Sequence, residues 1–100
     1  MAKGYWIAGV DVYDEDGYKS YVVANGPVFR KFGGRFLVRG ARATLKEGQC
    51  RARNVVIEFA SYQAALDCYN SPEYQQALAL RKPVSAANLI IIEGYDDPQS

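Results

Sequence analysis

The fold is decided first by the segment GYWIAGVDV, residues Gly4–Val12, in which side chains of different character alternate. Neighbouring side chains of a β-strand point to opposite faces of a sheet. A strand here therefore places Tyr5 and Ile7 on one face and Trp6 on the other. Acidic residues from Asp14 onwards end the apolar pattern, so we expect the strand to stop at about Val12.

Three further strands are expected at about residues 35–41, 53–59 and 88–95. Continuing the two-residue alternation through them gives one wholly apolar face and one mixed face. The apolar face is Trp6, Ala8, Val10, Phe36, Val38, Val55, Ile57, Phe59, Ile90 and Ile92. The mixed face is Tyr5, Ile7, Gly9, Asp11, Leu37, Arg39, Ala41, Val56, Glu58, Leu89, Ile91 and Glu93. We expect any functional site on the mixed face, because it carries the charged groups.

Helical patterns separate the strands. The first helix is expected from the cap Asp14 to about Phe32, with a kink where Gly26-Pro27 interrupts the backbone hydrogen bonds. A second helix begins after Ser61. A third, short helix begins at Ser71-Pro72, because serine caps helices well and proline favours the first helical position.

This order of elements predicts an α+β fold, a ferredoxin-like βαββαβ sandwich. Its four-stranded antiparallel sheet has the order 4-1-3-2, with both helical regions on one face. We expect a single domain over residues 1–96 and a C-terminal tail over 97–100. The apolar side chains of the uncovered face predict a homodimer in which two sheets close face to face.

The composition limits the classes of function. The chain has no histidine, which removes the usual neutral-pH base and the commonest zinc ligand, so neither a metal site nor a cofactor is expected. A net charge of +1 and a third strand without stacking aromatics argue against nucleic acid as a partner. No apolar run approaches the roughly 20 residues of a membrane span, so we expect no membrane contact and a cytoplasmic location.

Four charged residues of the mixed face form the first candidate site. Arg39 could hold an acidic group of a substrate with two hydrogen bonds. Glu58 or Glu93 could then act as a catalytic base while Asp11 tunes the site, and crowding of these acids would raise the pKa of at least one carboxyl. The alternative is structural: an Arg39–Glu58 ion pair, with the other acids in water at strand ends.

A second set of candidates would bind the substrate. Trp6, Tyr18 and Tyr69 could line a flat pocket for an aromatic ligand, although aromatics at this spacing are commonly core residues. Asn25 lies on an otherwise apolar helix face, where its amide must find a partner in a ligand or in the backbone near Gly26-Pro27. Whether the pocket lies between helices and sheet or between two sheets stays open.

Five segments carry a resemblance to known proteins: KGYWIA (3–8), GGRFLVRG (33–40), RNVVIEF (53–59), YNSPEY (69–74) and IEGYD (92–96). Together they resemble the bacterial family catalogued as domain of unknown function 1330 (DUF1330). The resemblance implies a ferredoxin-like fold in the dimeric α+β barrel superfamily, whose members include cofactor-independent monooxygenases, muconolactone isomerase and haem-degrading enzymes. It implies little about activity, because a fold does not carry its function from one member to another.

The expected protein is thus a small cytoplasmic homodimer with a pocket for a small molecule. It would be a cofactor-independent isomerase or oxygenase that acts on a small organic acid or an aromatic compound. The alternative is a non-catalytic module for ligand binding or dimerisation. The sequence leaves open whether the protein is an enzyme.

Overall fold

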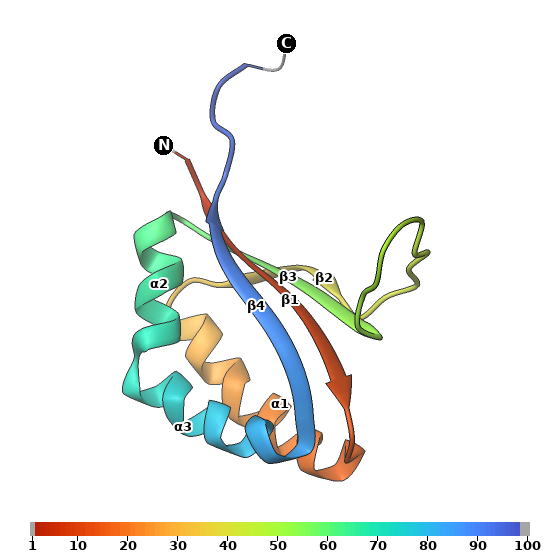
Figure 1. Cartoon of the computed structure of the whole chain (residues 1–100). Helices are drawn as coiled ribbons and strands as arrows, with labels where there is room; N and C mark the ends of the chain where they lie inside the picture. Colours follow the sequence, from red (N-terminus) through yellow and green to blue (C-terminus); the bar gives the residue numbers. More distant parts are fainter. Residues whose placement is uncertain (1, 99–100) are drawn as a thin grey trace.

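A computed structural model of the chain describes residues 2–98 (Figure 1). The elements are, in chain order, β1 (Gly4–Val12), α1 (Glu15–Lys31), β2 (Arg35–Arg39), β3 (Arg53–Phe59), α2 (Tyr62–Asn70), α3 (Pro72–Arg81), the 3-10 turn η1 (Lys82–Val84) and β4 (Ser85–Glu93). Residue 1 of the predicted domain and residues 99–100 of the predicted tail lie outside the described part.

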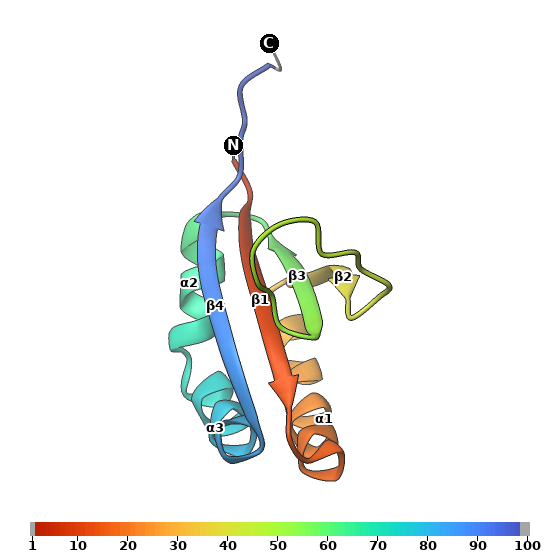
Figure 2. The ribbon, with the colours of Figure 1, turned by 45° about the vertical axis from the view of Figure 1, so that its right-hand side comes forward.

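The four strands form one antiparallel sheet in the order β2-β3-β1-β4. This confirms the predicted order, since it is 4-1-3-2 counted from the other edge. Figures 1 and 2 show α1, α2 and α3 on the same side of the sheet. The opposite side, called here the open face, is covered by no helix.

Side chains cap the helices where the sequence predicts. The Asp14 carboxylate accepts hydrogen bonds from the backbone N–H groups of Asp16 and Gly17 at 3.1 and 3.2 Å. Ser61 and Ser71 cap α2 and α3 in the same way. Each cap satisfies N–H groups that the first helical turn leaves without a partner.

The first helix is continuous from Glu15 to Lys31, so Gly26-Pro27 lies within it and does not end it. The buried side chains of Asn25, Val28 and Phe29 lie on both sides of this dipeptide. Their packing against the sheet keeps the segment helical, because burial of apolar surface outweighs the loss of one backbone hydrogen bond.

Trp6 anchors the layer between helices and sheet. Its side chain is 2% exposed, and the ring meets Phe29 and Tyr74 edge-on at centroid distances of 5.2 and 4.9 Å. Its indole N–H donates to the carbonyl of Ala65 in α2 at 2.8 Å. Edge-to-face contacts and a satisfied indole donor are the arrangement that stabilises a buried tryptophan.

Strand β4 has its faces the other way round from the prediction. Ile91 lies opposite Trp6 and Leu89 opposite Ala8, so Leu89 and Ile91 face the helices. Ile90 and Ile92 lie on the open face, where Ile90 is 53% exposed. Residues 89–92 are all apolar and show no alternation, so only the backbone register with β1 decides which of them face inwards.

Strand β2 carries a bulge that reverses its second half. Phe36 lies opposite Ile57 of β3, but Val38 then lies opposite Val56 and Arg39 opposite Val55. One extra residue in a strand moves every later side chain to the other face. The prediction for Val38 and Arg39 is therefore wrong: Val38 joins the open face, and Arg39 turns to the helix side.

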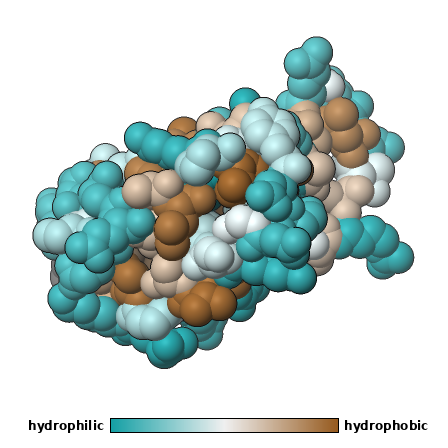
Figure 3. Space-filling model, turned by 90° about the horizontal axis from the view of Figure 1, so that it is seen from below, coloured by the Kyte–Doolittle hydropathy of each residue, from teal (hydrophilic) through white to brown (hydrophobic). Residues whose placement is uncertain are grey.

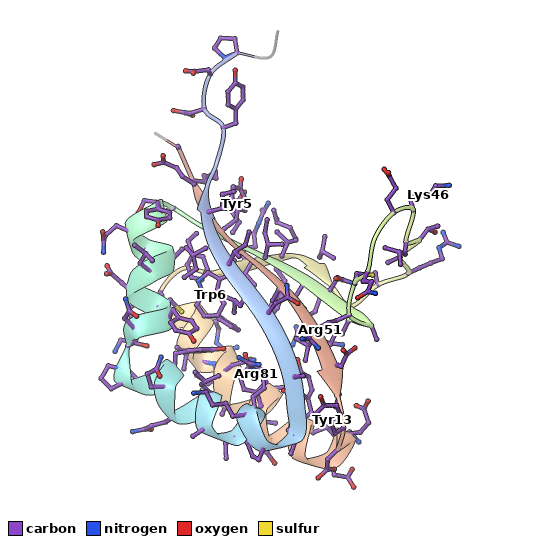
Figure 4. All side chains as sticks on the ribbon, viewed as in Figure 1. Tyr5, Trp6, Tyr13, Lys46, Arg51 and Arg81 are labelled. Atoms are coloured by element: carbon purple, nitrogen blue, oxygen red, sulfur yellow. The ribbon has the colours of Figure 1, made fainter. Side chains whose placement is uncertain are left out.

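Residues 40–52 form an irregular, exposed loop between β2 and β3, without the extended hairpin arms that the sequence left possible. Figures 1 and 2 place this loop on the side of the sheet away from the helices, and Figure 4 shows Lys46 at its outer end. None of the helices in the described residues is long and apolar enough to cross a lipid bilayer.

Candidate functional site

A small chamber lies between α1, the end of α3 and the sheet. Figure 4 shows Trp6 and Arg81 in this layer. Its free volume is about 40 Å³, room for about three water-sized groups. Its apolar floor consists of Trp6, Ala8, Val55, Ile57, Ala87 and Leu89, and its polar wall of Tyr18, Tyr21, Asn25, Arg39, Arg53 and Arg81. We call this space the inner chamber.

Three guanidinium groups line the inner chamber, those of Arg39, Arg53 and Arg81, and no Asp or Glu of the described residues lines it with them. The ion pairs found in this part of the chain use other cations, namely Lys19, Lys31, Arg35 and Arg51. Arginine stays protonated in proteins. Arg81 is buried, Arg53 is half-buried and Arg39 is exposed, so the cost of a charge removed from water without a partner falls mainly on Arg81. The chamber is therefore an electropositive space suited to an anion.

Arg81 is the most deeply placed of the three cations. The residue is only 8% exposed, and its guanidinium carbon lies 5.5 Å from the centre of the Tyr21 ring. The hydroxyls of Tyr21 and Tyr74 are hydrogen-bonded at 2.9 Å. Burial raises the pKa of Tyr74 far above its ordinary value, so this hydroxyl stays neutral and does not balance the charge of Arg81.

Arg53 stands at the side of the chamber against Tyr18. Its guanidinium carbon lies 5.7 Å from the centre of the Tyr18 ring, and its buried Nε has no hydrogen-bond partner among the described residues. Burial raises the pKa of Tyr18, the nearby Tyr21 adds to the rise, and the charge of Arg53 opposes it. The Tyr18 hydroxyl is thus a neutral donor beside a fixed positive charge.

Asn25 offers an acceptor to the same space. The residue is 5% exposed, and no atom of the described residues donates a hydrogen bond to its Oδ1. A buried amide oxygen without a partner is uncommon in folded proteins. A ligand with a hydroxyl or another donor would satisfy it, so the chamber offers one acceptor beside its cationic groups.

The structure brings together four of the five predicted substrate-binding residues. Trp6, Tyr18, Asn25 and Arg39 all line the inner chamber. Tyr69 does not line it: its ring packs behind Trp6 at 5.7 Å and against Tyr74 at 5.3 Å. Arg39 reaches the chamber through the bulge in β2, where its guanidinium also stacks on the Phe36 ring at 4.2 Å.

The sequence interpretation missed Arg53 and Arg81. Arg53 has a readable signal, because the alternation of Val55, Ile57 and Phe59 continues back to it and places it on the helix side. Arg81 carries no such signal, since an arginine in a last helical turn is ordinarily a surface residue that favours the helix dipole.

The three predicted catalytic acids do not line the inner chamber and do not meet one another. Glu58 lies on the open face, where it accepts a hydrogen bond from the Tyr5 hydroxyl at 3.1 Å and lies 3.8 Å from Arg35. Its arginine partner is therefore Arg35, so the expected pair with Arg39 is wrong. Glu93 lies exposed at the end of β4 opposite Gly4.

Asp11 has a structural role at the base of the 40–52 loop. Its carboxylate accepts hydrogen bonds from the backbone N–H of Ala52 and from Arg51 Nη1, both at 2.9 Å. The hydrogen bond from Ala52 is the largest cause that lowers the pKa of Asp11, and Arg51 lowers it further. This shift is opposite to the rise that a crowded catalytic carboxyl would show.

No group of three or more metal-ligating side chains among residues 2–98 could hold a metal ion. Cys68 is buried and Cys50 is exposed, and neither lines the inner chamber. The chemistry that the site offers is therefore that of guanidinium, hydroxyl and amide groups around an apolar floor.

Comparison with known proteins adds a family and a fold. The family model described as Domain of unknown function (DUF1330) matches residues 3–95. The chain belongs to this family. No curated protein matches this DUF1330 chain with significance.

Solved structures share the ferredoxin-like fold of this DUF1330 chain. A protein of unknown function from Rhodopseudomonas palustris is 18% identical, with a TM-score of 0.75 over 96% of this chain and 85% of its own. SnoaB from Streptomyces nogalater, described as a cofactor-independent oxygenase, is 11% identical, with a TM-score of 0.60 over 100% and 97%. A dimeric ferredoxin-like protein of unknown function from Thermobifida fusca is 18% identical, with a TM-score of 0.59 over 92% and 89%. At these identities the likeness shows the fold alone.

Proposed function

We propose that this protein is a homodimer that binds a small organic acid in the inner chamber. The observation that carries the proposal is Arg81, a buried cation beside two tyrosine hydroxyls, with no carboxylate among the described residues that line the chamber. A carboxylate ligand would supply the missing charge. Its two oxygens could also accept two parallel hydrogen bonds from the planar guanidinium group.

The other lining groups support a ligand that is small and partly polar. The free volume suits a short acid group with a few attached atoms. Ala8 and Leu89 offer apolar contact, and Asn25 Oδ1 offers an acceptor for a hydroxyl. The apolar floor favours an acid with an apolar body over an inorganic anion, and a hydroxyl on that acid would satisfy the amide oxygen.

The open face supports the homodimer. A row of apolar side chains crosses it from β2 to β4: Val38, Val56, Ile7 and Ile90. Three of these four are more than one-third exposed in the single chain, and contiguous apolar area of this kind marks interfaces. The Thermobifida fusca neighbour is described as dimeric, which favours the same assembly here.

Ligand binding is better supported than catalysis by a carboxylate base. Asp11, Glu58 and Glu93 all lie outside the chamber, so none of them can reach a proton of a ligand held there. A second candidate is oxygenation without a cofactor, which the description of SnoaB favours. In that case the arginines would hold an anionic substrate while oxygen reacts with it.

A binding experiment tests the proposal directly. Trp6 is the only tryptophan and lines the chamber, so its fluorescence reports occupancy. We expect butyrate to change this fluorescence saturably, and Arg81→Met to weaken binding at least tenfold. Glu58→Gln is the matched control and should bind like the wild type, because Glu58 lies on the open face. Equal binding by wild type and Arg81→Met would refute the proposed site.

Oxygenation has a separate readout. Oxygen uptake in an electrode cell, with a bound acid as substrate, would rise with enzyme concentration and disappear in Arg81→Met. An acid that binds and causes no oxygen uptake would leave the protein as a ligand-binding module. This result would favour the non-catalytic alternative.

A further inference from the structure

A second chamber adjoins the first at the end of the sheet where α1 begins. Its free volume is about 230 Å³, several times that of the inner chamber. It is lined by Val10, Val12, Glu15, Tyr18, Gly40, Ala52 and Arg53. We call it the outer chamber. Figure 3 views the molecule from this end, where brown apolar patches interrupt the polar surface.

The two chambers meet at Arg53. Three residues line both of them, namely Val10, Tyr18 and Arg53. Val10 and Arg53 are direct partners on β1 and β3, and Tyr18 lies above them on α1. The guanidinium of Arg53 therefore stands where a molecule in one chamber would continue into the other.

Gly40 determines where this guanidinium lies. A Cβ atom at position 40 would be 2.6 Å from Arg53 Nη1, far too close, so the guanidinium packs directly against the glycine backbone. The N–H of Gly40 donates to the carbonyl of Asn54 at 2.8 Å, which holds this backbone in place beside β3. Arg53 is thus confined between Gly40 on one side and the Tyr18 ring on the other.

We propose that the two chambers form one channel with Arg53 at its neck, and that the ligand is an elongated monocarboxylic acid. This inference rests on the proposed function and makes it more specific. The acid group binds in the inner chamber, which Arg39, Arg53 and Arg81 line, and the remainder passes the neck into the outer chamber. Gly40 is a positioning residue, because it acts on the ligand only through Arg53.

The chemistry of the outer chamber selects the class of acid. The inner chamber alone has room for about three water-sized groups, so a longer acid must pass the neck. Glu15 is the one charged side chain of the described residues that lines the outer chamber besides Arg53. It would repel a second carboxylate, which favours a monocarboxylate over a dicarboxylate.

The first test compares two glycines of the same loop. Gly40→Ala forces Arg53 away and also strains a left-handed backbone, with φ at +65°. Gly48→Ala imposes the same strain at φ +76° but meets nothing within 4 Å, so it is the matched control. We expect Gly40→Ala to weaken hexanoate binding at least tenfold, as Arg53→Met does, and Gly48→Ala to leave binding unchanged.

The combination of the two changes tests whether Gly40 acts through Arg53. Adding Gly40→Ala to Arg53→Met should weaken hexanoate binding less than twofold further, because the guanidinium that it displaces is already gone. If the two changes weaken hexanoate binding by independent factors that multiply, Gly40 does not act through Arg53 and its positioning role is overturned. Hexanoate binding by Gly40→Ala that equals binding by Gly48→Ala would overturn it as well.

A second test uses chain length and does not depend on the folding of a glycine variant. Affinity should rise from acetate to hexanoate by up to about fourfold for each methylene that enters the outer chamber. Val12→Phe fills the outer chamber, so its affinity for hexanoate should fall close to its affinity for acetate. Val23→Phe changes an exposed position of α1 and should leave the difference between the two affinities unchanged. Adipate should bind more weakly than hexanoate, and Glu15→Gln should narrow this difference.

The outcomes separate this inference from the proposed function. Acids that bind through Arg81 with an affinity independent of chain length would overturn the channel and leave the proposed function standing. A wild type that binds none of the acids would refute both. Affinity that rises with chain length and is lost in Val12→Phe supports the channel.

Discussion

The hydroxyl groups of Tyr21 and Tyr74 lie 2.9 Å apart in the buried layer between α1 and α3. This hydrogen bond joins two helices that are far apart in the sequence. It also gives each hydroxyl its partner within the protein, so that neither has to be satisfied by a ligand. Arg81 interacts with both hydroxyls, but no Asp or Glu of the described residues lines the chamber to balance its positive charge.

Removing either hydroxyl should destabilise the protein by a modest amount. We expect Tyr74→Phe to lower the free energy of unfolding by about 1–2 kcal/mol, because the Tyr21 hydroxyl is left buried without its partner. Urea denaturation followed by circular dichroism measures this change. Tyr21→Phe should cost about the same, and the double variant should cost less than the sum of the two. Strict additivity would mean that the two hydroxyls do not interact.

Arg81 should show opposite effects on stability and on binding. Arg81→Met removes an unbalanced buried charge, so we expect an unchanged or higher free energy of unfolding in the absence of ligand, by up to about 1–4 kcal/mol. The same variant should lose most of its affinity for acids. Thermal unfolding with and without butyrate separates the two effects, because butyrate should raise the Tm of the wild type alone. A variant that is clearly less stable without ligand would indicate a structural role for Arg81.

Cys68 should make stability depend on pH in the alkaline range. Burial raises the pKa of its thiol from 9.0 to about 12. Below pH 9.0 both folded and unfolded chains hold this proton, so the full stability is present. Between pH 9.0 and about 12 the unfolded chain releases the proton while the folded chain keeps it, so stability falls as pH rises.

The slope from this one thiol should be about 1.4 kcal/mol per pH unit. Cys68→Ala removes it, so the stability difference between wild type and Cys68→Ala should shrink as pH rises through this range. Denaturant unfolding at several alkaline pH values gives the measurement. Cys50→Ala is the control, since Cys50 is exposed and its removal should leave the slope unchanged. A constant difference between wild type and Cys68→Ala would contradict the shifted pKa.

The homodimer predicted for the open face should depend on Ile90. Ile90→Asp places a charge at the β4 end of the apolar row, so we expect a shift from dimer to monomer in light scattering coupled to gel filtration. Val23→Asp changes an equally apolar residue on α1, 77% exposed on the helix side, and should leave the dimer intact. A wild type that is monomeric at micromolar concentration would contradict the assembly.

Much of the architecture follows from local patterns in the sequence. Three kinds of signal lead to the observed strands, helices and sheet order. They are the alternation of Gly4–Val12, the helix caps Asp14, Ser61 and Ser71, and the order of the elements along the chain. Each of these signals acts within a few residues: a side chain either alternates between faces or meets an N–H group two or three positions away. Such short-range chemistry can be read without knowing the rest of the chain.

The composition of the candidate site was decided by tertiary structure. The bulge after Phe36 turns Arg39 to the helix side, and the pairing of Ile91 with Trp6 selects the inward face of β4. Both depend on the register between strands that are distant in sequence, and a shift of one residue exchanges every side chain between the faces.

The expected convergence of acids failed for two reasons. Asp11 lies six residues along β1 from Tyr5, the partner of Glu58, and the register of β4 puts Glu93 opposite Gly4, on the other face. Asp11 binds the base of the loop, Glu58 pairs with Arg35, and Glu93 ends its strand in solvent. The sequence by itself determined which elements form and in what order they lie in the sheet. Only the tertiary structure decided which charges share a chamber, because that depends on strand register and helix packing, which no local pattern specifies.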